Sequence, residues 1–412
     1  MARRGRLPGV SRDAPVICHV DMDCFYAACE RLREPALEGE PVVVGMGYGP
    51  GGTHGAVATA SYEAREYGVE SAQAISEALE LLPRKGEAAA DPDLEVADAG
   101  FYRPVDMDHY ESVAADVREL LHEEADVVRE LSIDEAYLDV TDHVTWKNAR
   151  AFARDLASRI ENEVGVTASI GVAPTMSAAK VASDRDKPDG LVVVEPGAVR
   201  DFFAPLDVEA VHGVGPVTAR ELRTMGIETA GDLAATDPTR IRERFGERGL
   251  EVRRFARGED DRPVEPKGDP KSLSKESAFT EATTDGERKR ERVRSLAAAV
   301  ADRAEREGAL YRTIGIKVVT PPFEVNTRAE SLPGPVADPA LVEEVALDLL
   351  GEFGGTEVRK LGIRVSNLSF TEGDQLALDS WDPSSTETDR EENTEESRDD
   401  GDGRQRTLGE FR

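Results

Sequence analysis

Two short acidic motifs follow apolar runs that are typical of β-strands. The first is DMDCFYA at residues 21–27, after the run VICHV, and the second is SIDEAYLD at residues 132–139. Carboxylates at strand ends often bind cations, and carboxylate oxygens are ligands that Mg²⁺ prefers. Asp21, Asp134 and Glu135 would offer ligands to two Mg²⁺ ions, which is the equipment for in-line phosphoryl transfer. The alternative is that these acidic residues lie in turns exposed to water. For a single Asp that alternative would be favoured, but two motifs of this specificity argue against it.

The elements around these motifs predict how the carboxylates come together. Apolar periodicity indicates the order β-α-β-β-α-β, with a long interruption after the first strand. After that strand, which ends at Asp21, we expect a helix at 108–124, strands at 127–133 and 136–140, a helix at 146–164 that ends at Gly165, and a strand at 166–172. This order is the ferredoxin-like split motif, which would put Asp21 and the Asp134-Glu135 pair on adjacent strands.

The interruption, residues 25–104, reads as a small inserted domain. Its glycine-rich stretch at 45–55 invites comparison with a phosphate-binding loop. The stretch lacks the GK[ST] ending that such a loop needs, so we expect a hairpin loop instead.

A predominantly helical stretch follows at 196–259. It contains VHGVGPVTA at residues 211–219, which is similar to the helix-hairpin-helix motif. In that motif, glycines such as Gly213 and Gly215 let backbone N–H groups approach a DNA phosphate at a helix N-terminus. The alternative is a simple helical hairpin without a DNA contact.

A charged linker at 260–270 precedes a second β-α-β-β-α-β order at 271–370, a topological echo of the first unit. The matching strand ends carry no paired carboxylates. We therefore expect this second unit to bind rather than to catalyse, which gives a multidomain α/β (α+β) protein.

The composition limits the class of protein. A chain of 412 residues predicts about three domains, since domains run to roughly 100–200 residues. No apolar run approaches the ~18 residues of a membrane-spanning helix. The basic arm at 1–13 lacks the apolar core of a secretory signal. Three cysteines without a repeated CxxC spacing indicate free thiols in a reducing, cytoplasmic setting.

The net charge of −31 looks unfavourable for a protein that binds nucleic acid. Arginine greatly outnumbers lysine, and acidic residues occur in every segment. This pattern indicates a halophilic archaeon, because the Debye length falls to about 3 Å at 1 M salt and an acidic surface then repels DNA little. The alternative is an ordinary acidic protein with no polyanionic partner.

The tail at 371–412 is rich in Ser, Thr, Asp and Glu and is predicted to be disordered. Its end, QRTLGEFR, matches the pattern Q-x-x-[ILM]-x-x-[FY] that binds the sliding clamp. Gln405, Leu408 and Phe411 would form this motif, with Leu408 and Phe411 on one face of a helical turn. A second copy at residues 375–381 ends in Trp381.

These motifs, in this order over residues 16–368, resemble the Y-family DNA polymerases of the DNA polymerase IV (DinB) class. The resemblance implies that Asp21, Asp134 and Glu135 are catalytic ligands of two Mg²⁺ ions, with the Met22 backbone carbonyl as a further ligand. It implies a distributive, low-fidelity polymerase that performs translesion synthesis without proofreading, binds primer-template DNA and dNTPs, and is a monomer.

Further positions follow from the same resemblance. Tyr62, Arg65 and Lys187 match residues that bind the dNTP triphosphate, and Tyr26 matches the steric gate that excludes ribonucleotides. The lead-in to Lys180 departs from the family pattern, which makes Lys180 a weaker candidate for a DNA contact. The implied division of the chain is a palm at 14–24 and 105–195, fingers at 25–104, a thumb at 196–259, a linker at 260–270, a little finger at 271–370, and the tail.

Two other classes compete with this interpretation. A catalytically idle scaffold for DNA and the clamp would not need the intact carboxylates Asp21, Asp134 and Glu135. A nucleotidyl cyclase would have a similar palm, but it would not need the helical region, the second β-α-β-β-α-β unit or the clamp motif.

Overall fold

The computed structural model describes residues 14–370, which fall into two compact units that meet at the Gly268–Asp269 bond. Each unit is described by itself. Within residues 14–370, none of the helices combines the length and the apolar character needed to cross a membrane.

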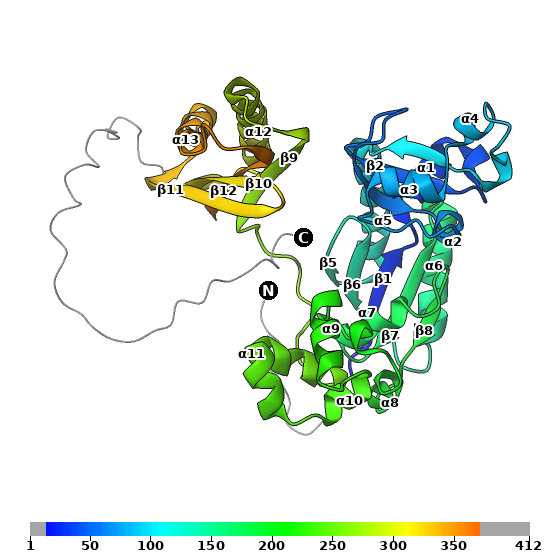
Figure 1. The fold of residues 1–412 in the computed structure, drawn as a ribbon. Coiled ribbons are helices and arrows are strands. Elements are labelled where there is room, and N and C mark those ends of the chain that lie inside the picture. Colours follow the sequence, from blue (N-terminus) through cyan, green and yellow to red (C-terminus); the bar gives the residue numbers. More distant parts are fainter. Residues whose placement is uncertain (1–13, 371–412) are drawn as a thin grey trace, which may run out of the picture. The chain divides into compact units, whose positions relative to one another are not determined.

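The first unit is built on a five-stranded sheet with the order β5-β6-β1-β7-β8 (Figure 1). Its strands are β1 (Ile17–Met22), β5 (Val127–Glu130), β6 (Glu135–Asp139), β7 (Ala168–Ala173) and β8 (Leu191–Val193). All six residues of β1 are buried, and β1 pairs antiparallel with both β6 and β7. Side chains alternate across a strand, so Cys18 and Val20 enter one core while His19 and Asp21 face the other side.

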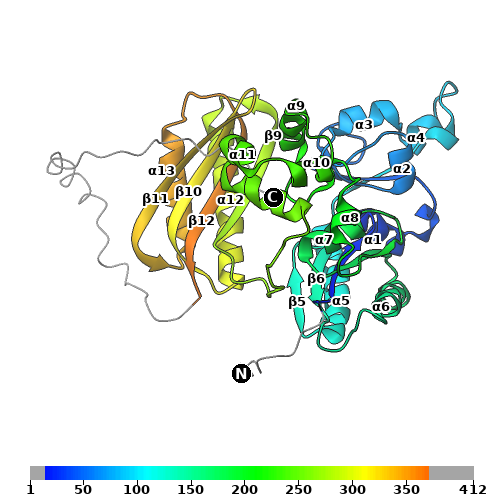
Figure 2. The ribbon, with the colours of Figure 1, turned by 90° about the horizontal axis from the view of Figure 1, so that it is seen from below.

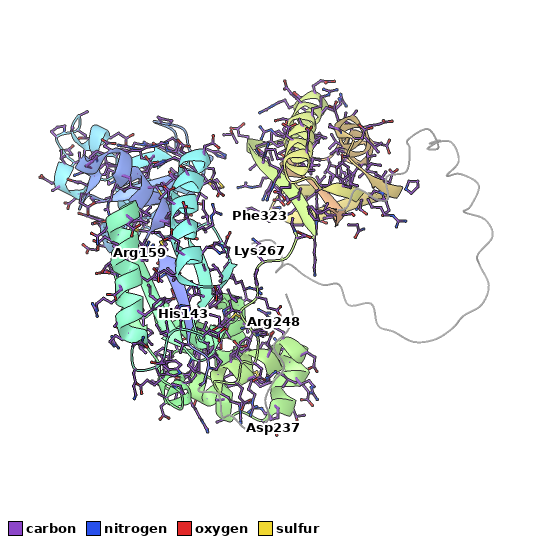
Figure 3. The ribbon with its side chains drawn as sticks, turned by 180° about the vertical axis from the view of Figure 1, so that it is seen from behind. His143, Arg159, Asp237, Arg248, Lys267 and Phe323 are labelled. Atoms are coloured by element: carbon purple, nitrogen blue, oxygen red, sulfur yellow. The ribbon has the colours of Figure 1, made fainter. Side chains whose placement is uncertain are left out.

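Two long helices cover the face that Cys18 and Val20 enter. They are α5 (Met107–Glu124) and α6 (Ala149–Val164). The apolar positions predicted from helical spacing are buried, and Gly165 ends α6 in the left-handed conformation with φ 84°. Arg159 on α6 forms ion pairs with Glu163, with Glu123 at 2.9 Å and with Glu124, which ties the two helices together at the surface (Figure 3). The β-α-β-β-α-β order and the ferredoxin-like strand order are confirmed.

The segment between β1 and α5 forms a separate three-stranded sheet with the order β3-β2-β4. The elements of this segment are α1 (Phe25–Arg33), the 3₁₀ helix η1 (Pro35–Leu37), β2 (Val42–Met46), β3 (Ala56–Ala60), α2 (Tyr62–Glu66), α3 (Ile75–Leu81), α4 (Lys85–Ala88), η2 (Val96–Asp98) and β4 (Phe101–Pro104). β2 and β3 pair antiparallel, so the glycine-rich stretch is a hairpin loop, as predicted.

Helices dominate the rest of the first unit. They are α7 (Met176–Ser183), α8 (Val199–Phe203), η3 (Val208–Ala210), α9 (Pro216–Thr224), α10 (Ala230–Ala235) and α11 (Pro238–Ala256). The residues after α11 have no regular structure, yet Asp260 and Val264 are buried. The Asp260 carboxylate accepts a hydrogen bond from the Ser177 backbone N–H at 3.0 Å, so the start of the predicted linker is attached to the N-terminus of α7.

The second unit repeats the order of elements but not the order of strands. It contains β9 (Ser272–Thr283), α12 (Gly286–Arg306), β10 (Leu310–Thr320), β11 (Glu324–Val336), α13 (Pro339–Gly351) and β12 (Val358–Ser369). Its antiparallel sheet has the order β11-β10-β12-β9, and Figure 2 shows β11, β10 and β12 side by side. The fourth strand, β12, thus pairs with the first and second, β9 and β10. In the first unit the fourth strand, β7, pairs with the first, β1, and with the additional strand β8. The second unit therefore repeats the predicted order of elements along the chain, but the order of its strands in the sheet differs from that of the first unit.

Candidate active site

The centre of the candidate site is the end of β1, the middle strand of the first sheet. Asp21 lies opposite Glu135 on β6 and opposite Ser169 on β7. Directly opposed residues of antiparallel strands have Cβ atoms about 4.5–5.5 Å apart and share a face. The fold therefore brings Asp21 and Glu135 side by side, as the sequence predicted.

Two lysines neutralise these carboxylates. Lys187 Nζ lies 2.5 Å from Asp21 Oδ1, and Lys180 Nζ lies 2.5 Å from Glu135 Oε1 and 3.9 Å from Asp21 Oδ2. Lys187 also pairs with Asp184 at 3.0 Å. All four charged groups of the Asp21–Glu135 site are less than a third exposed, so these pairs are screened less than surface pairs.

The two carboxyls differ in their pKa values. Burial raises the pKa of Asp21 well above its usual range, although Lys187 acts in the opposite direction. Burial would also raise the pKa of Glu135, but Lys180 and Lys187 outweigh it and the pKa is lowered. The pKa of Lys187 rises because Asp21 and Asp184 outweigh its burial. A cation with more charge than one ammonium group would favour ionised Asp21 further.

Asp134 lies beside this pair, in the turn between β5 and β6. Its carboxylate Oδ1 accepts a hydrogen bond from Ser132 Oγ at 2.6 Å, and its backbone carbonyl accepts one from the Met22 N–H at 2.9 Å. Among residues 14–370, the structure gathers no group of three or more His, Cys, Asp or Glu side chains able to hold a metal. Asp21 and Glu135 face each other, but their carboxylates and that of Asp134 do not form such a group of three. The donor set, carboxylate and carbonyl oxygens, still suits Mg²⁺ in kind.

Tyr62 and Arg65 are both on α2, in the inserted domain. The Arg65 guanidinium lies over the Tyr62 ring, 4.6 Å from its centroid, and Arg65 Nε donates to the Ala60 carbonyl at 3.0 Å. The Tyr62 hydroxyl donates to Asp23 Oδ1 at 3.0 Å. Burial, followed by the Asp23 charge, raises the pKa of Tyr62, so its hydroxyl remains a donor at neutral pH.

Tyr26, in the first turn of α1, stacks on Tyr110 of α5. The ring centroids are 4.5 Å apart with an interplanar angle of 17°. Tyr110 is fully buried, and its hydroxyl donates to Glu30 Oε1 at 2.7 Å. Tyr26 is partly exposed, and a rigid neighbour fixes the plane of its ring.

Gly213 and Gly215, the two glycines of the helix-hairpin-helix motif, differ in whether the fold requires glycine. Gly213 has φ 88°, and a Cβ there would lie 3.1 Å from Nη2 of Arg248 on α11 (Figure 3). Gly215 is extended, with φ −95° and ψ 175°, and a Cβ there would meet no atom within 4 Å. The fold therefore requires glycine at position 213 but not at position 215.

Comparison with known proteins agrees with this arrangement. The model of the impB/mucB/samB family matches residues 20–184, its C-terminal domain matches residues 270–378, and the family's HHH motif matches residues 196–227. A DNA polymerase IV of Halobacterium salinarum is 63% identical over 374 residues, which cover 90% of each chain. This chain belongs to the Y family of DNA polymerases, in the DNA polymerase IV (DinB) class.

Other similarities support the same family. A DNA polymerase IV of Methanoculleus marisnigri is 38% identical over 367 residues, covering 89% of this chain and 98% of the relative. A solved Y-family DNA polymerase chimera is 28% identical, with a TM-score of 0.75 over 86% of this chain and all of its own. DinB from Sulfolobus solfataricus is 27% identical, with a TM-score of 0.59 over the same shares. The chain is a DNA-directed DNA polymerase, and the predicted halophilic archaeal origin is confirmed.

Three residues of this Y-family site were missed or undervalued in the sequence. Lys180 was a weak candidate for a DNA contact, yet its ammonium group touches Glu135. Asp23 is buried beside Tyr62, and the only sequence signal was its spacing of two from Asp21. Tyr110, which supports Tyr26, had no signal, because nothing in the sequence links residues so far apart. The clamp motif Gln405, Leu408 and Phe411 lies outside the described residues.

Proposed function

We propose that this polymerase adds dNTPs to the 3′-hydroxyl of a primer on template DNA, with two Mg²⁺ ions held by Asp21, Asp134, Glu135 and the Met22 backbone carbonyl. The observation that carries the proposal is the facing pair Asp21 and Glu135, each with a lysine ammonium against it. Carboxylates that attract two cations in a partly buried site are suited to hold divalent ones. When bound, such ions stabilise the attacking and leaving oxygens of phosphoryl transfer.

The residues around the carboxylates would bind the nucleotide. Lys187 and Arg65 carry charges that can neutralise a triphosphate, and Arg65 can contact phosphate oxygens in a bidentate manner. Tyr62 would contact the triphosphate beside them, with its hydroxyl held by Asp23. Tyr26 would select deoxyribonucleotides, because an aromatic ring held in one plane excludes a 2′-hydroxyl sterically.

We assign the polymerase domains by the division that the family resemblance implies. We assign the palm to 14–24 and 105–195, the fingers to 25–104, the thumb to 196–259, the linker to 260–270 and the little finger to 271–370. These assignments account for all of residues 14–370 without an exonuclease, so synthesis would lack proofreading and be of low fidelity and distributive.

The partners of the enzyme are primer-template DNA and dNTPs. A solved relative is described as an insertion ternary complex of Dbh DNA polymerase, with a TM-score of 0.62 and 27% identity. Gly213 and Gly215 would bring backbone N–H groups to a DNA phosphate, and the open space at Gly215 supports that approach. Gln405, Leu408 and Phe411 would bind a sliding clamp. We further infer a monomer that acts in the cytoplasm, where its DNA substrate lies.

Primer extension in high salt with Mg²⁺ and dNTPs tests the metal assignment. Asp134→Asn and Glu135→Gln should each reduce extension by at least about a hundredfold, because the substitution removes charge from a ligand of the metal and not from the core. DNA affinity should stay near that of the wild type, as should the thermal unfolding of Asp134→Asn. Glu135→Gln should lower the melting temperature, because Lys180 loses its carboxylate partner.

Asp139→Asn is the matched control, since Asp139 lies in the same motif at the far end of β6. It should extend primers normally. Wild-type extension by Asp134→Asn or Glu135→Gln would refute the assignment, and an inactive wild-type protein would instead indicate a DNA-binding scaffold.

A further inference from the structure

Asp23 is a buried carboxylate that the mechanism above does not use. Its side chain belongs to a residue that is 1% exposed, just beyond the end of β1. A buried charge is costly unless hydrogen bonds compensate it. What compensates Asp23 therefore indicates what the residue is for.

Three groups donate to this carboxylate, and the single hydroxyl proton of Ser169 is shared between its two oxygens. Oδ1 accepts from the Tyr62 hydroxyl at 3.0 Å and from Ser169 Oγ at 2.9 Å. Oδ2 accepts from the Asp189 backbone N–H at 2.8 Å and from Ser169 Oγ at 3.1 Å. All three donors are uncharged, so the bonds orient the carboxylate without neutralising it.

The donors come from three separate parts of the first unit. Tyr62 begins α2 of the inserted domain, and Ser169 belongs to β7. Asp189 lies in the turn that follows Lys187, with φ 53°, and the next residue, Gly190, donates its N–H to Ser169 Oγ at 3.0 Å. Asp23 therefore joins α2 to the turn that carries Lys187.

The same bonds separate Asp23 from the metal ligands. An ionised carboxylate offers about four lone-pair sites, and the protons of Tyr62, Ser169 and Asp189 take up most of them on both oxygens. Asp21, two residues earlier, has lysine ammonium groups as partners instead. The two acids of the DMD motif thus have different neighbours and different tasks.

We propose that Asp23 is a positioning residue for the triphosphate of the incoming nucleotide. It holds α2 through the Tyr62 hydroxyl, and it holds the turn after Lys187, so that Arg65 of α2 and Lys187 meet the phosphates together. The proposal rests on the roles given above to Tyr62 and Lys187. It assigns to Asp23 no contact with the nucleotide or the metal.

Steady-state kinetics of Asp23→Asn test this. Asn has nearly the same shape, but its NH₂ group must face a donor, either the Tyr62 or Ser169 hydroxyl or the Asp189 N–H. We expect KM for dNTP and the inhibition constant of pyrophosphate to rise together by about tenfold, which is the scale of one lost hydrogen bond to a charged group. The value of kcat should fall much less, and the Kd for primer-template DNA should not change.

A double-mutant cycle of Asp23→Asn with Tyr62→Phe distinguishes a positioning role of Asp23 from a general loss of structure. Tyr62→Phe should raise KM for dNTP in the wild type and add little in Asp23→Asn, because the hydroxyl is already released. The control Asp338→Asn removes a carboxylate that accepts from the Ala340 and Leu341 N–H groups at the start of α13, in the other unit. It should leave both phosphate constants unchanged.

Several outcomes would overturn the proposal. Unchanged dNTP and pyrophosphate constants in Asp23→Asn would do so, as would a loss confined to kcat or fully additive effects with Tyr62→Phe. If Tyr62→Phe and Lys187→Ala themselves leave KM for dNTP unchanged, the triphosphate roles fail and this inference fails with them. Should Asp23→Asn not fold, Ser169→Ala removes the hydroxyl that the two oxygens share, and it must shift both constants in the same direction.

Discussion

At the scale of single residues, Lys180 and Lys187 explain how two carboxylates can be partly buried next to each other. Each lysine places an ammonium group 2.5 Å from one carboxylate oxygen. Removing one partner of a buried pair costs more than the pair contributes, because the other charge is left uncompensated. The lysines therefore belong to the folding of the site as well as to its chemistry.

The stacked pair Tyr26 and Tyr110 leads to a prediction about sugar selection. Tyr26→Ala should raise ribonucleotide incorporation by about a hundredfold or more relative to dNTP incorporation, because a steric barrier is lost without a new hydrogen bond. Comparing CTP with dCTP incorporation in both proteins measures this. Tyr110→Phe is the control, since it keeps the stacked ring and loses only the bond to Glu30. An unchanged ratio in Tyr26→Ala would make Tyr26 a packing residue.

A carboxylate of the second unit gives a pH dependence with a defined sign. Glu276 on β9 pairs with Lys317 at 2.8 Å and with Lys360. Burial would raise the pKa of Glu276, but the two lysines outweigh it and lower the pKa. Its contribution to stability is therefore present above its unfolded pKa and is lost as the pH falls through the folded pKa.

Glu276→Gln should accordingly destabilise the second unit by about 1 kcal/mol at neutral pH, since the pair is only partly buried. The difference from the wild type should shrink toward zero as the pH falls below the folded pKa of Glu276, because Glu276 is then protonated in both states. Calorimetric melting temperatures over this range measure it. Glu281→Gln, an exposed site on the same strand, should show no such trend. A difference that persists in acid would exclude the ion pairs as its cause.

At the scale of elements, the close approach of α7 to β7 decides where Lys180 lies. A Cβ on Gly171 would come within 2.0 Å of the Ala179 carbonyl oxygen and 2.4 Å of the Ser183 N. The helix thus rests directly on the strand beside β1, and Lys180 reaches across to Glu135 on β6. A larger residue at position 171 would displace the helix and the lysine with it.

Gly215 offers a clean test of the helix-hairpin-helix contact, because its extended backbone and open surroundings accept a Cβ. Gly215→Ala should leave thermal stability within about 1 kcal/mol. It should weaken binding of primer-template DNA by about tenfold, since a methyl group would keep the helix end from a phosphate. Fluorescence anisotropy measures the affinity.

Gly351→Ala serves as the control for Gly215→Ala, because a Cβ there also meets no atom within 4 Å and it lies in the other unit, at the end of α13. It should leave DNA binding unchanged. Equal affinities of Gly215→Ala and wild type would indicate a simple helical hairpin at residues 211–219.

The sequence predicted those structural features whose physical cause lies within a single helix or strand. Helical spacing and Gly165 indicated α6, and the apolar run before Asp21 indicated β1, because both signals lie within one element. The strand order of the second unit could not be predicted, since the same order of elements allows more than one pairing. The place of Lys180 was also hidden, because it depends on the packing of α7 against Gly171.

At the scale of the whole molecule, the net charge of −31 sets how the enzyme can meet DNA. Where salt reduces the Debye length to about 3 Å, neither repulsion nor attraction extends far from the surface. Affinity must then come from direct contacts and from tethering. The Halobacterium relative, at 63% identity, fits such an environment.

Tethering leads to a prediction about the end of the chain. Deleting residues 405–412 should abolish stimulation of synthesis by the sliding clamp and leave clamp-free synthesis unchanged. The tail at 371–412, which is predicted to be disordered, would hold the enzyme near DNA at roughly millimolar effective concentration once its tip is bound to the clamp. Titrating the clamp on a primed circular template measures both activities. Replacing Leu408 and Phe411 by Ala should match the deletion, and full stimulation without residues 405–412 would point to the copy at 375–381.

The position of β1 between two partners also limits how this gene can change. Ile17 to Asp21 are matched residue by residue with β6 on one side and with β7 on the other. A substitution in β1 alters one side chain, but an inserted or deleted codon turns every later side chain of the strand to the opposite face. After a deletion, for example, Asp21 would enter the apolar core and Met22 would take its place opposite Glu135. A change in the length of the strand before Asp21 should therefore abolish catalysis, whereas many single substitutions in β1 should not.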